Sequence, residues 1–149
     1  MCHQCNYEEL LSEADLKVTP NRVRVLEVIG NNRFPLSASD IYNILERSDA
    51  IDRVTVYRIL DLLVEHGVVD RISTGGRAFY YGMAPNDHHK PHPHFYCKSC
   101  GQMDCLSPES LTVDTGPLWK TYPGRIVKVE IRIDGICKNC EKRQTKKNH

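Results

Sequence analysis

The first half of the chain repeats hydrophobic residues at intervals of three and four, the spacing that gives a helix one apolar side. This pattern predicts helices over residues 7–16, 20–29, 38–47 and 52–67. Thr19 before Pro20 is typical of a helix N-cap followed by proline at the first helical position. Gly30 is expected to end that helix, and Ser37 with Asp40 is expected to cap the next one.

The pattern then changes to the shorter period of strands. Residues 68–73 and 77–81 are predicted to be strands joined by a glycine turn over residues 74–76. Helices followed by a hairpin of this kind predict a winged helix-turn-helix. The helix over residues 52–67 would be the one that enters a DNA groove.

The last third of the chain is predicted to be mixed helix and strand. Alternation predicts strands over residues 94–97, 102–106 and 126–133, of which the last has the strongest pattern. Gly116 and Pro117 oppose a helix over residues 111–122, so only a short or broken one is expected there. The basic tail after Cys140 is expected to be frayed.

These elements predict an α+β fold in two domains. Residues 1–84 form the winged-helix domain, and residues 94–149 form a small α/β domain. Residues 85–93 lie between them, and their proline, histidine and aspartate content is typical of a hinge.

Composition narrows the class of protein. No apolar run approaches the roughly 18 residues of a membrane span, and the N-terminus lacks the basic and apolar regions of a signal peptide. We therefore expect a cytoplasmic protein without a membrane partner, in which the seven cysteines are metal ligands or redox thiols. The net charge is only +1, so binding to DNA would depend on a local basic face and on specific contacts.

Two Cys-x-x-Cys pairs carry the clearest chemistry: Cys97 with Cys100, and Cys137 with Cys140. Four thiolates can enclose one tetrahedral Zn²⁺, and such closed sites are structural. The alternative is that these cysteines are small buried apolar residues. A closed site has no open coordination position, and the chain lacks a His-Glu-x-x-His helix, so we expect neither an enzyme nor a small-molecule substrate.

Two further groups of residues point to metal sensing and DNA. His92 and His94 alternate at the entrance of a predicted strand, so both imidazoles can point to one side and suggest a second metal site. Thr55, Tyr57 and Arg58 lie at the start of the fourth helix, where a recognition helix contacts bases. The alternative for Tyr57 and Arg58 is a solvated face or a protein-binding surface.

Several motifs in this order resemble the ferric uptake regulator family, closest to its zinc-sensing branch. They are Val18-Thr-Pro-Asn-Arg22, Ser37-Ala-Ser-Asp-Ile-Tyr42, Ala50-Ile-Asp-Arg-Val-Thr-Val-Tyr-Arg-Ile-Leu60, Gly67-Val-Val-Asp70, His92-x-His94-x-x-Cys97-x-x-Cys100-Gly101 and Gly135-Ile-Cys137-x-x-Cys140. The resemblance implies a homodimeric repressor that binds a palindromic double-stranded DNA operator when loaded with metal. It also implies that the C-terminal domain is the dimerisation domain.

The resemblance implies ligands for the regulatory metal. His92 and His94 match the family's histidines, and Asp70 matches a ligand of the zinc-sensing members. Cys105 stands where the family usually has a carboxylate, and soft sulfur with imidazole favours Zn²⁺ over Fe²⁺. We therefore predict a structural Zn²⁺ and a regulatory Zn²⁺ or Fe²⁺ in each chain.

The resemblance also extends the DNA-contacting set. Lys17 matches the family's basic residue before Thr19-Pro20, which is suited to a minor groove, and Thr19 is a further residue of the predicted DNA-contacting set. Arg22 and Arg77 are expected to hold phosphates.

Alternatives remain open at this point. An iron(II)-responsive regulator, a thiol- or peroxide-responsive regulator, and an interaction module without a DNA role would all have similar motifs. A further metal site of the family is expected to be lost, because Pro91 and Pro93 stand at its ligand positions. Cys2 with Cys5 could be a thiol pair or part of an unordered tail, and His88 with His89 are spare candidate ligands.

Overall fold

The computed structural model describes residues 6–85 and 91–147 of the 149-residue chain. It divides into two compact units, Met1–Pro91 and His92–His149. The hinge predicted over residues 85–93 includes residues 86–90, which lie outside the described part. The same holds for Cys2, Cys5, His88 and His89.

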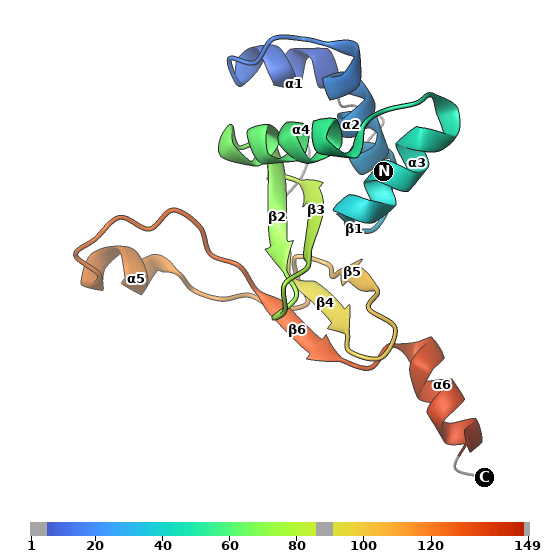
Figure 1. Ribbon diagram of the computed structural model, residues 1–149. Coiled ribbons are helices and arrows are strands. Elements are labelled where there is room, and N and C mark those ends of the chain that lie inside the picture. Colours follow the sequence, from blue (N-terminus) through green and yellow to red (C-terminus); the bar gives the residue numbers. More distant parts are fainter. Residues whose placement is uncertain (1–5, 86–90, 148–149) are drawn as a thin grey trace. The chain divides into compact units, whose positions relative to one another are not determined.

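Helices dominate the N-terminal unit (Figure 1). They are α1 (Tyr7–Glu13), α2 (Pro20–Asn31), α3 (Ala38–Ser48) and α4 (Arg53–Glu65). The helices predicted for this unit are therefore confirmed, with small differences at their ends. The first helix is shorter than predicted, because Asp15 adopts a left-handed φ of 61° that ends it.

The helix starts follow local capping chemistry. Thr19 Oγ1 accepts a hydrogen bond from the backbone N–H of Arg22 at 3.3 Å. Ser37 Oγ accepts from the N–H of Asp40 at 3.1 Å, and Asp40 Oδ2 accepts from the N–H of Ser37 at 3.3 Å. Each such cap is typically worth about 1 kcal/mol, so α2 and α3 begin where the sequence predicts.

Gly30 does not end α2, and this prediction was wrong. The helix continues to Asn31, and Gly30 is buried within it. A Cβ at Gly30 would lie 2.8 Å from Cε1 of Tyr7. The glycine is therefore used for its small size, which lets the Tyr7 ring of α1 pack against α2.

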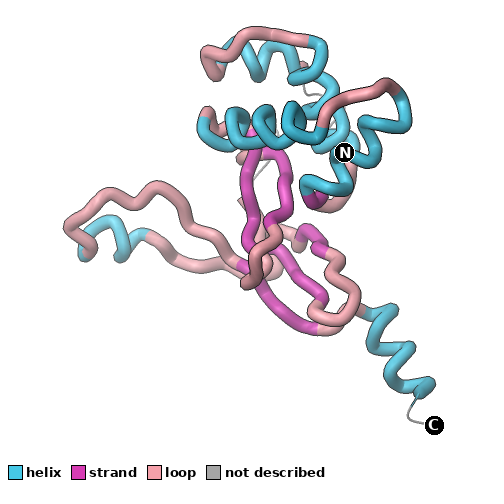
Figure 2. Tube along the Cα trace, viewed as in Figure 1, coloured by secondary structure: helices cyan, strands magenta, loops and turns pink. Residues whose placement is uncertain are grey.

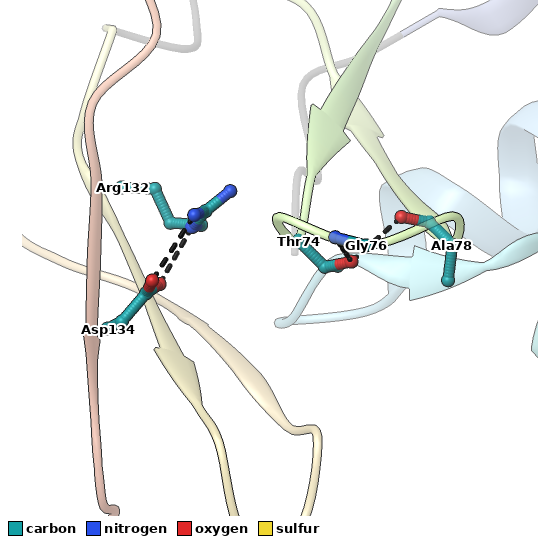
Figure 3. Close-up of polar contacts among 5 residues, drawn as sticks. All are labelled: Thr74, Gly76, Ala78, Arg132 and Asp134. Carbon is teal, nitrogen blue, oxygen red and sulfur yellow. Dashed lines mark hydrogen bonds and ion pairs between the residues drawn. The ribbon is translucent and has the colours of Figure 1, made fainter.

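A hairpin follows the helices. Strands β1 (Leu36–Ser37), β2 (Val69–Ser73) and β3 (Phe79–Met83) form an antiparallel sheet in the order β1-β3-β2. In the turn, Thr74 Oγ1 donates to the Ala78 carbonyl at 2.9 Å and accepts from the Gly76 N–H at 3.4 Å (Figure 3). The β2–β3 hairpin confirms the predicted wing, whereas β1 was not predicted, because two residues carry no detectable alternation.

The core of this unit joins the helices to the hairpin. Its fully buried side chains include Leu11, Leu26, Ile41, Leu60 and Leu63. The core contains residues of α1 to α4 together with Val69 and Tyr81 of the hairpin. This unit is the winged helix of the predicted α+β fold.

The C-terminal unit is built on β4 (His94–Cys97), β5 (Met103–Cys105) and β6 (Arg132–Gly135), with helices α5 (Gly116–Thr121) and α6 (Lys138–Lys147). The strand order is β5-β4-β6, in which β4 pairs with β5 antiparallel and with β6 parallel (Figures 1 and 2). The short α5 agrees with the expectation for residues 111–122.

Two predictions for this unit were wrong. Strand β6 starts at Arg132, not at residue 126, because β4 is only four residues long and offers a partner to residues 132–135. The tail is not frayed over its first part, since α6 begins at Lys138. The alternating residues before Arg132 therefore lie outside the strand, and Val127 is 84% exposed.

Candidate metal centres and nucleic-acid surface

The parallel pairing of β4 with β6 brings the two Cys-x-x-Cys pairs together. Cys97 ends β4, and its partner in the ladder is Gly135, two residues before Cys137. After β4, the chain turns back sharply at Gly101, whose φ of 78° favours glycine. The four sulfur atoms of Cys97, Cys100, Cys137 and Cys140 all lie within 4.8 Å of one another. We call this group the four-cysteine cluster.

The geometry of the four-cysteine cluster fits a tetrahedral ion. Zinc–sulfur bonds of about 2.3 Å place the sulfur atoms of a tetrahedron roughly 3.8 Å apart. The Sγ atoms of Cys100 and Cys137 lie 3.8 Å apart. Cys97 and Cys140 are buried, Cys137 is half-buried and Cys100 is exposed, so the cluster could hold a metal ion at the edge of this unit.

Electrostatics within the four-cysteine cluster are uneven. Hydrogen bonds from the backbone N–H groups of Cys100 and Cys137 favour the Cys97 thiolate and lower its pKa to about 6. For Cys140, a hydrogen bond with Ser99 favours the thiolate, but contacts with the neighbouring thiols and burial outweigh it and raise the pKa to about 11. Four crowded thiolates repel one another, so full deprotonation requires a cation such as Zn²⁺.

A second cluster lies at the other end of the same strands. His94 on β4 is the ladder partner of Cys105 on β5. Ring centroids of His92 and His94 are 4.7 Å apart, and one ring nitrogen from each, with Cys105 Sγ, all lie within 4.8 Å of one another. We call these three residues the histidine–cysteine cluster. The structure thus brings together three of the four residues predicted to bind the regulatory metal.

The fourth predicted ligand belongs to the other unit. Asp70 lies on β2, where its ladder partner is Gly82. The spare candidates His88 and His89 lie outside the described residues.

Desolvation shifts the pKa values of two residues in the histidine–cysteine cluster. Desolvation, together with the neighbouring His92, lowers the pKa of His94 to about 4, and Nε2 of His92 is fully buried. Burial and then the charge of Asp104 raise the pKa of the Cys105 thiol. At neutral pH, His94 is therefore a ready neutral ligand, whereas Cys105 must lose a proton to bind a metal.

Zinc binding to this cluster is expected to release about one proton from Cys105 near neutral pH. Because the thiol pKa is raised, the proton is present in the metal-free protein, and zinc affinity should rise about tenfold per pH unit in this range. His94, with a pKa of about 4, contributes no proton above roughly pH 5. Calorimetric titration in buffers of different ionisation enthalpy measures the protons released. Cys105→Ser should release about one fewer, and equal release by both proteins would contradict this assignment.

The candidate DNA-contacting residues lie at the start of α4 and in its surroundings. Tyr57 and Arg58 are exposed, Thr55 is half-buried, and the opposite side of α4 is buried in the core. Val54 belongs to the apolar pattern that predicts this helix, but it is 51% exposed on the first turn of α4. The only sequence signal for the exposure of Val54 is that this apolar residue stands beside polar residues in the first turn of the helix.

The remaining candidates occupy the loop before α2 and the hairpin turn. Lys17 is exposed, and its carbonyl accepts a hydrogen bond from Arg22 Nη1 at 2.8 Å. Thr19 is the cap of α2, so both it and Arg22 shape this loop. Arg77 is exposed in the turn of the hairpin.

Within residues 6–85 and 91–147, no helix combines the length and the apolar character needed to cross a bilayer.

Comparison with known proteins gives consistent matches. The family model described as the ferric uptake regulator family matches residues 13–133. The ferric uptake regulation protein of Bacillus subtilis is 31% identical over 137 residues, which cover 91% of this chain and 92% of that protein.

Solved structures give similar matches. The ferric uptake regulator of Helicobacter pylori aligns with a TM-score of 0.72 at 21% identity, covering 95% of this chain and 97% of that one. A zinc uptake regulator complexed with zinc and DNA aligns with a TM-score of 0.66 at 23% identity, covering 93% and 92%.

Proposed function

The chain belongs to the ferric uptake regulator family, and on that premise we propose that this metal-responsive regulator is a zinc-dependent, DNA-binding transcriptional repressor. The observation that carries the proposal is the pair of clusters in the C-terminal unit. One offers four thiols, and the other offers two imidazoles and one thiol. A closed site and an incomplete site in one unit suit a structural and a regulatory metal respectively.

The four-cysteine cluster is proposed to hold structural Zn²⁺. Thiolate ligands select Zn²⁺ over harder cations, and a full set of four leaves no position for substrate or water. In this role the metal links the turn after β4 to the first turn of α6 and holds the unit together.

The histidine–cysteine cluster is proposed to hold the regulatory metal, with Asp70 as the further ligand that the family resemblance supplies. Cys105 is the residue that supports zinc as the effector, because a thiolate with imidazoles suits Zn²⁺ better than Fe²⁺. Iron(II) with a differently completed site, or oxidation of Cys105, are the alternatives within the same family. Metal binding would shift the protein towards the conformation that is competent to bind the operator.

DNA binding is proposed to use Thr55, Tyr57 and Arg58 of α4. Arg58 can pair with guanine, and Tyr57 can contact a thymine methyl group or a phosphate. Four more residues would position the protein on the sugar–phosphate backbone and in the minor groove: Lys17, Thr19, Arg22 and Arg77. The similarity to a regulator complexed with zinc and DNA supports this role.

A palindromic operator requires two copies of the chain. The segment before β6 supports a homodimer, because Val127 and Val129 expose 84% and 46% of their surface and alternate with charged residues. Trp119 of α5 is 58% exposed as well. A second copy covering these apolar side chains would remove them from water.

The test compares the wild-type protein with Cys105→Ser. Metal content is measured on reduced protein, and binding to an operator selected from a random DNA library is titrated with Zn²⁺ and, anaerobically, with Fe²⁺. We expect about two zinc ions per wild-type chain and about one in the variant, with loss of zinc-dependent operator binding.

Other results would redirect the proposal. One zinc ion in both proteins, with operator binding restored only by Fe²⁺, would exclude zinc as the effector. Operator binding that ignores both metals but is lost on oxidation would instead favour a thiol sensor.

A further inference from the structure

The connection between α3 and α4 leads directly into the first turn of the helix that is proposed to contact DNA (Figure 1). It consists of residues 49–52, three of which are exposed, while Ile51 packs against the core. We call these four residues the α3–α4 turn. The conformation of this turn sets where α4 begins and where its first side chains point, so contacts that hold the turn also position the candidate base-contacting residues.

The start of α4 differs from the starts of the two preceding helices. Thr19 and Ser37 each accept a capping hydrogen bond at the beginning of α2 and α3. Within the described residues, the Asp52 side chain at the N-cap of α4 makes no capping hydrogen bond. Because a local cap is what usually fixes the first turn of a helix, the start of α4 depends more on contacts from other helices.

Arg24 on α2 supplies such a contact. Its Nη2 donates to the Leu45 carbonyl at 3.0 Å and to the Asp49 carbonyl at 3.0 Å. The same nitrogen lies 3.4 Å from Ser48 Oγ, and Nη1 donates to Asn21 Oδ1 at 3.3 Å. One half-buried guanidinium therefore joins α2 to the last turn of α3 and to the first residue of the α3–α4 turn.

The charge of Arg24 suits this position. The last carbonyls of a helix have no intrahelical donor and form the negative end of the helix dipole, so a cation is favourable there. The guanidinium also offers several N–H groups in one rigid plane. One side chain can thus hold the Leu45 and Asp49 carbonyls in a fixed relation, and with them the path of the chain out of α3.

A second contact holds the other end of the α3–α4 turn. Arg53 is the first residue of α4, and its guanidinium carbon lies 4.5 Å from the centroid of the Tyr42 ring on α3. A cation over an aromatic face is attracted by it. The turn is therefore held to α2 at its first residue and to α3 directly after its last one.

We propose that Arg24 is a positioning residue for DNA recognition, which fixes the start of α4 so that Tyr57 and Arg58 meet the base edges. The inference rests on the proposed DNA-binding function and deepens it, because it assigns Arg24 a role in specificity without a contact to DNA. Without the guanidinium, the two carbonyls bond to water and the turn samples several conformations. Operator affinity then falls with the fraction of molecules in the competent conformation.

The experiment uses the full, zinc-loaded chain and the operator selected from random DNA, and it measures affinity by fluorescence anisotropy at several salt concentrations. Arg24→Met keeps the apolar stem and removes the donors. Operator affinity is expected to fall about tenfold, and the ratio of operator to random-DNA affinity should fall by a similar factor. The slope of log affinity against log salt should stay unchanged, whereas loss of a phosphate contact would reduce it by about 0.9.

Two comparisons isolate the positioning role. Arg47→Met is the matched control, because it removes the same charge from an exposed position in the last turn of α3, and it should leave the specificity ratio unchanged. A double-mutant cycle combines Arg24→Met with Arg58→Ala. If Arg24 acts through α4, Arg24→Met costs clearly less operator affinity in the Arg58→Ala background than in the wild type.

Several results would overturn the inference. They are an unchanged specificity ratio in Arg24→Met, additive effects in the cycle, an equal loss in Arg47→Met, and a reduced salt slope, which would mean that Arg24 contacts phosphate itself. If Arg24→Met does not fold, Arg24→Lys carries the same test, because its shorter side chain keeps the charge and places the donors one bond further from the carbonyls.

Hydrogen exchange separates this inference from the proposed function. The amides in the first turn of α4 should exchange faster in Arg24→Met than in the wild type, with or without DNA, and equal exchange would overturn the role of Arg24. If the double variant of Tyr57 and Arg58 binds the operator normally, the proposed DNA contact of α4 is wrong instead. Circular dichroism and zinc content confirm that each variant is folded.

Discussion

Replacement of Cys97 by serine is expected to abolish zinc binding at the four-cysteine cluster and to unfold the C-terminal unit. Among the described residues of this unit, the buried apolar side chains are Pro93, Cys97, Met103 and Cys140. Two of these four are proposed metal ligands, so the unit has almost no core without the ion.

The expected magnitude follows from comparison of two free energies. Structural zinc contributes about 10–16 kcal/mol in small zinc domains, whereas whole domains are stable by only about 5–15 kcal/mol. Loss of the zinc site would therefore exceed what the remaining contacts of β4, β5 and β6 can supply. The winged-helix unit has its own core and should stay folded.

Denaturation followed by circular dichroism, together with zinc content, measures this effect. The variant should lose one zinc ion per chain and a separate unfolding transition, and a chelator should do the same to the wild-type protein. Cys105→Ser is the control, since it removes a thiol from the same unit and should keep the structural zinc. Full zinc content and normal unfolding in Cys97→Ser would exclude the structural role.

The second large effect is expected for the double substitution of Tyr57 and Arg58 by alanine. Both side chains are exposed on α4, whereas Val56, Ile59 and Leu60 on the other side of the helix are buried. The double variant should therefore fold and bind zinc normally. Each good base contact is worth about 1–3 kcal/mol, so operator affinity should fall by roughly two to three orders of magnitude.

Fluorescence anisotropy with labelled operator, at a stated salt concentration, checks this prediction. Loss of the Arg58 charge also weakens non-specific binding, so the specificity ratio between operator and random DNA is the decisive quantity. Lys142→Ala is the matched control, because it removes one positive charge from α6. Operator affinity within a few-fold of wild type in the double variant would favour a protein-binding role for α4.

Local chemistry explains which features could be predicted from the sequence. The starts of α2 and α3 follow from Thr19, Ser37 and Asp40, whose side chains bond to backbone groups within three residues. The hairpin follows from alternation and the glycine turn. The two Cys-x-x-Cys pairs likewise predict a metal site from the sequence alone.

Packing between segments that are distant in the sequence determines the features that the sequence patterns did not predict. Gly30 lies inside α2 because the Tyr7 ring of α1 occupies the space of a side chain there. Val54 is exposed because the other side of α4 faces the core. Strand β6 starts late because its partner β4 is short, although the hydrophobic alternation begins at residue 126.

The sequence by itself determined the types of metal ligand, which are thiols and imidazoles in the last third of the chain. It also determined the winged helix with which the chain begins. Only the tertiary structure decided which of these ligands meet. The parallel pairing of β4 with β6 brings Cys137 to Cys97. Such pairings join residues about 40 positions apart, and their register depends on backbone hydrogen bonds between strands that no local pattern encodes.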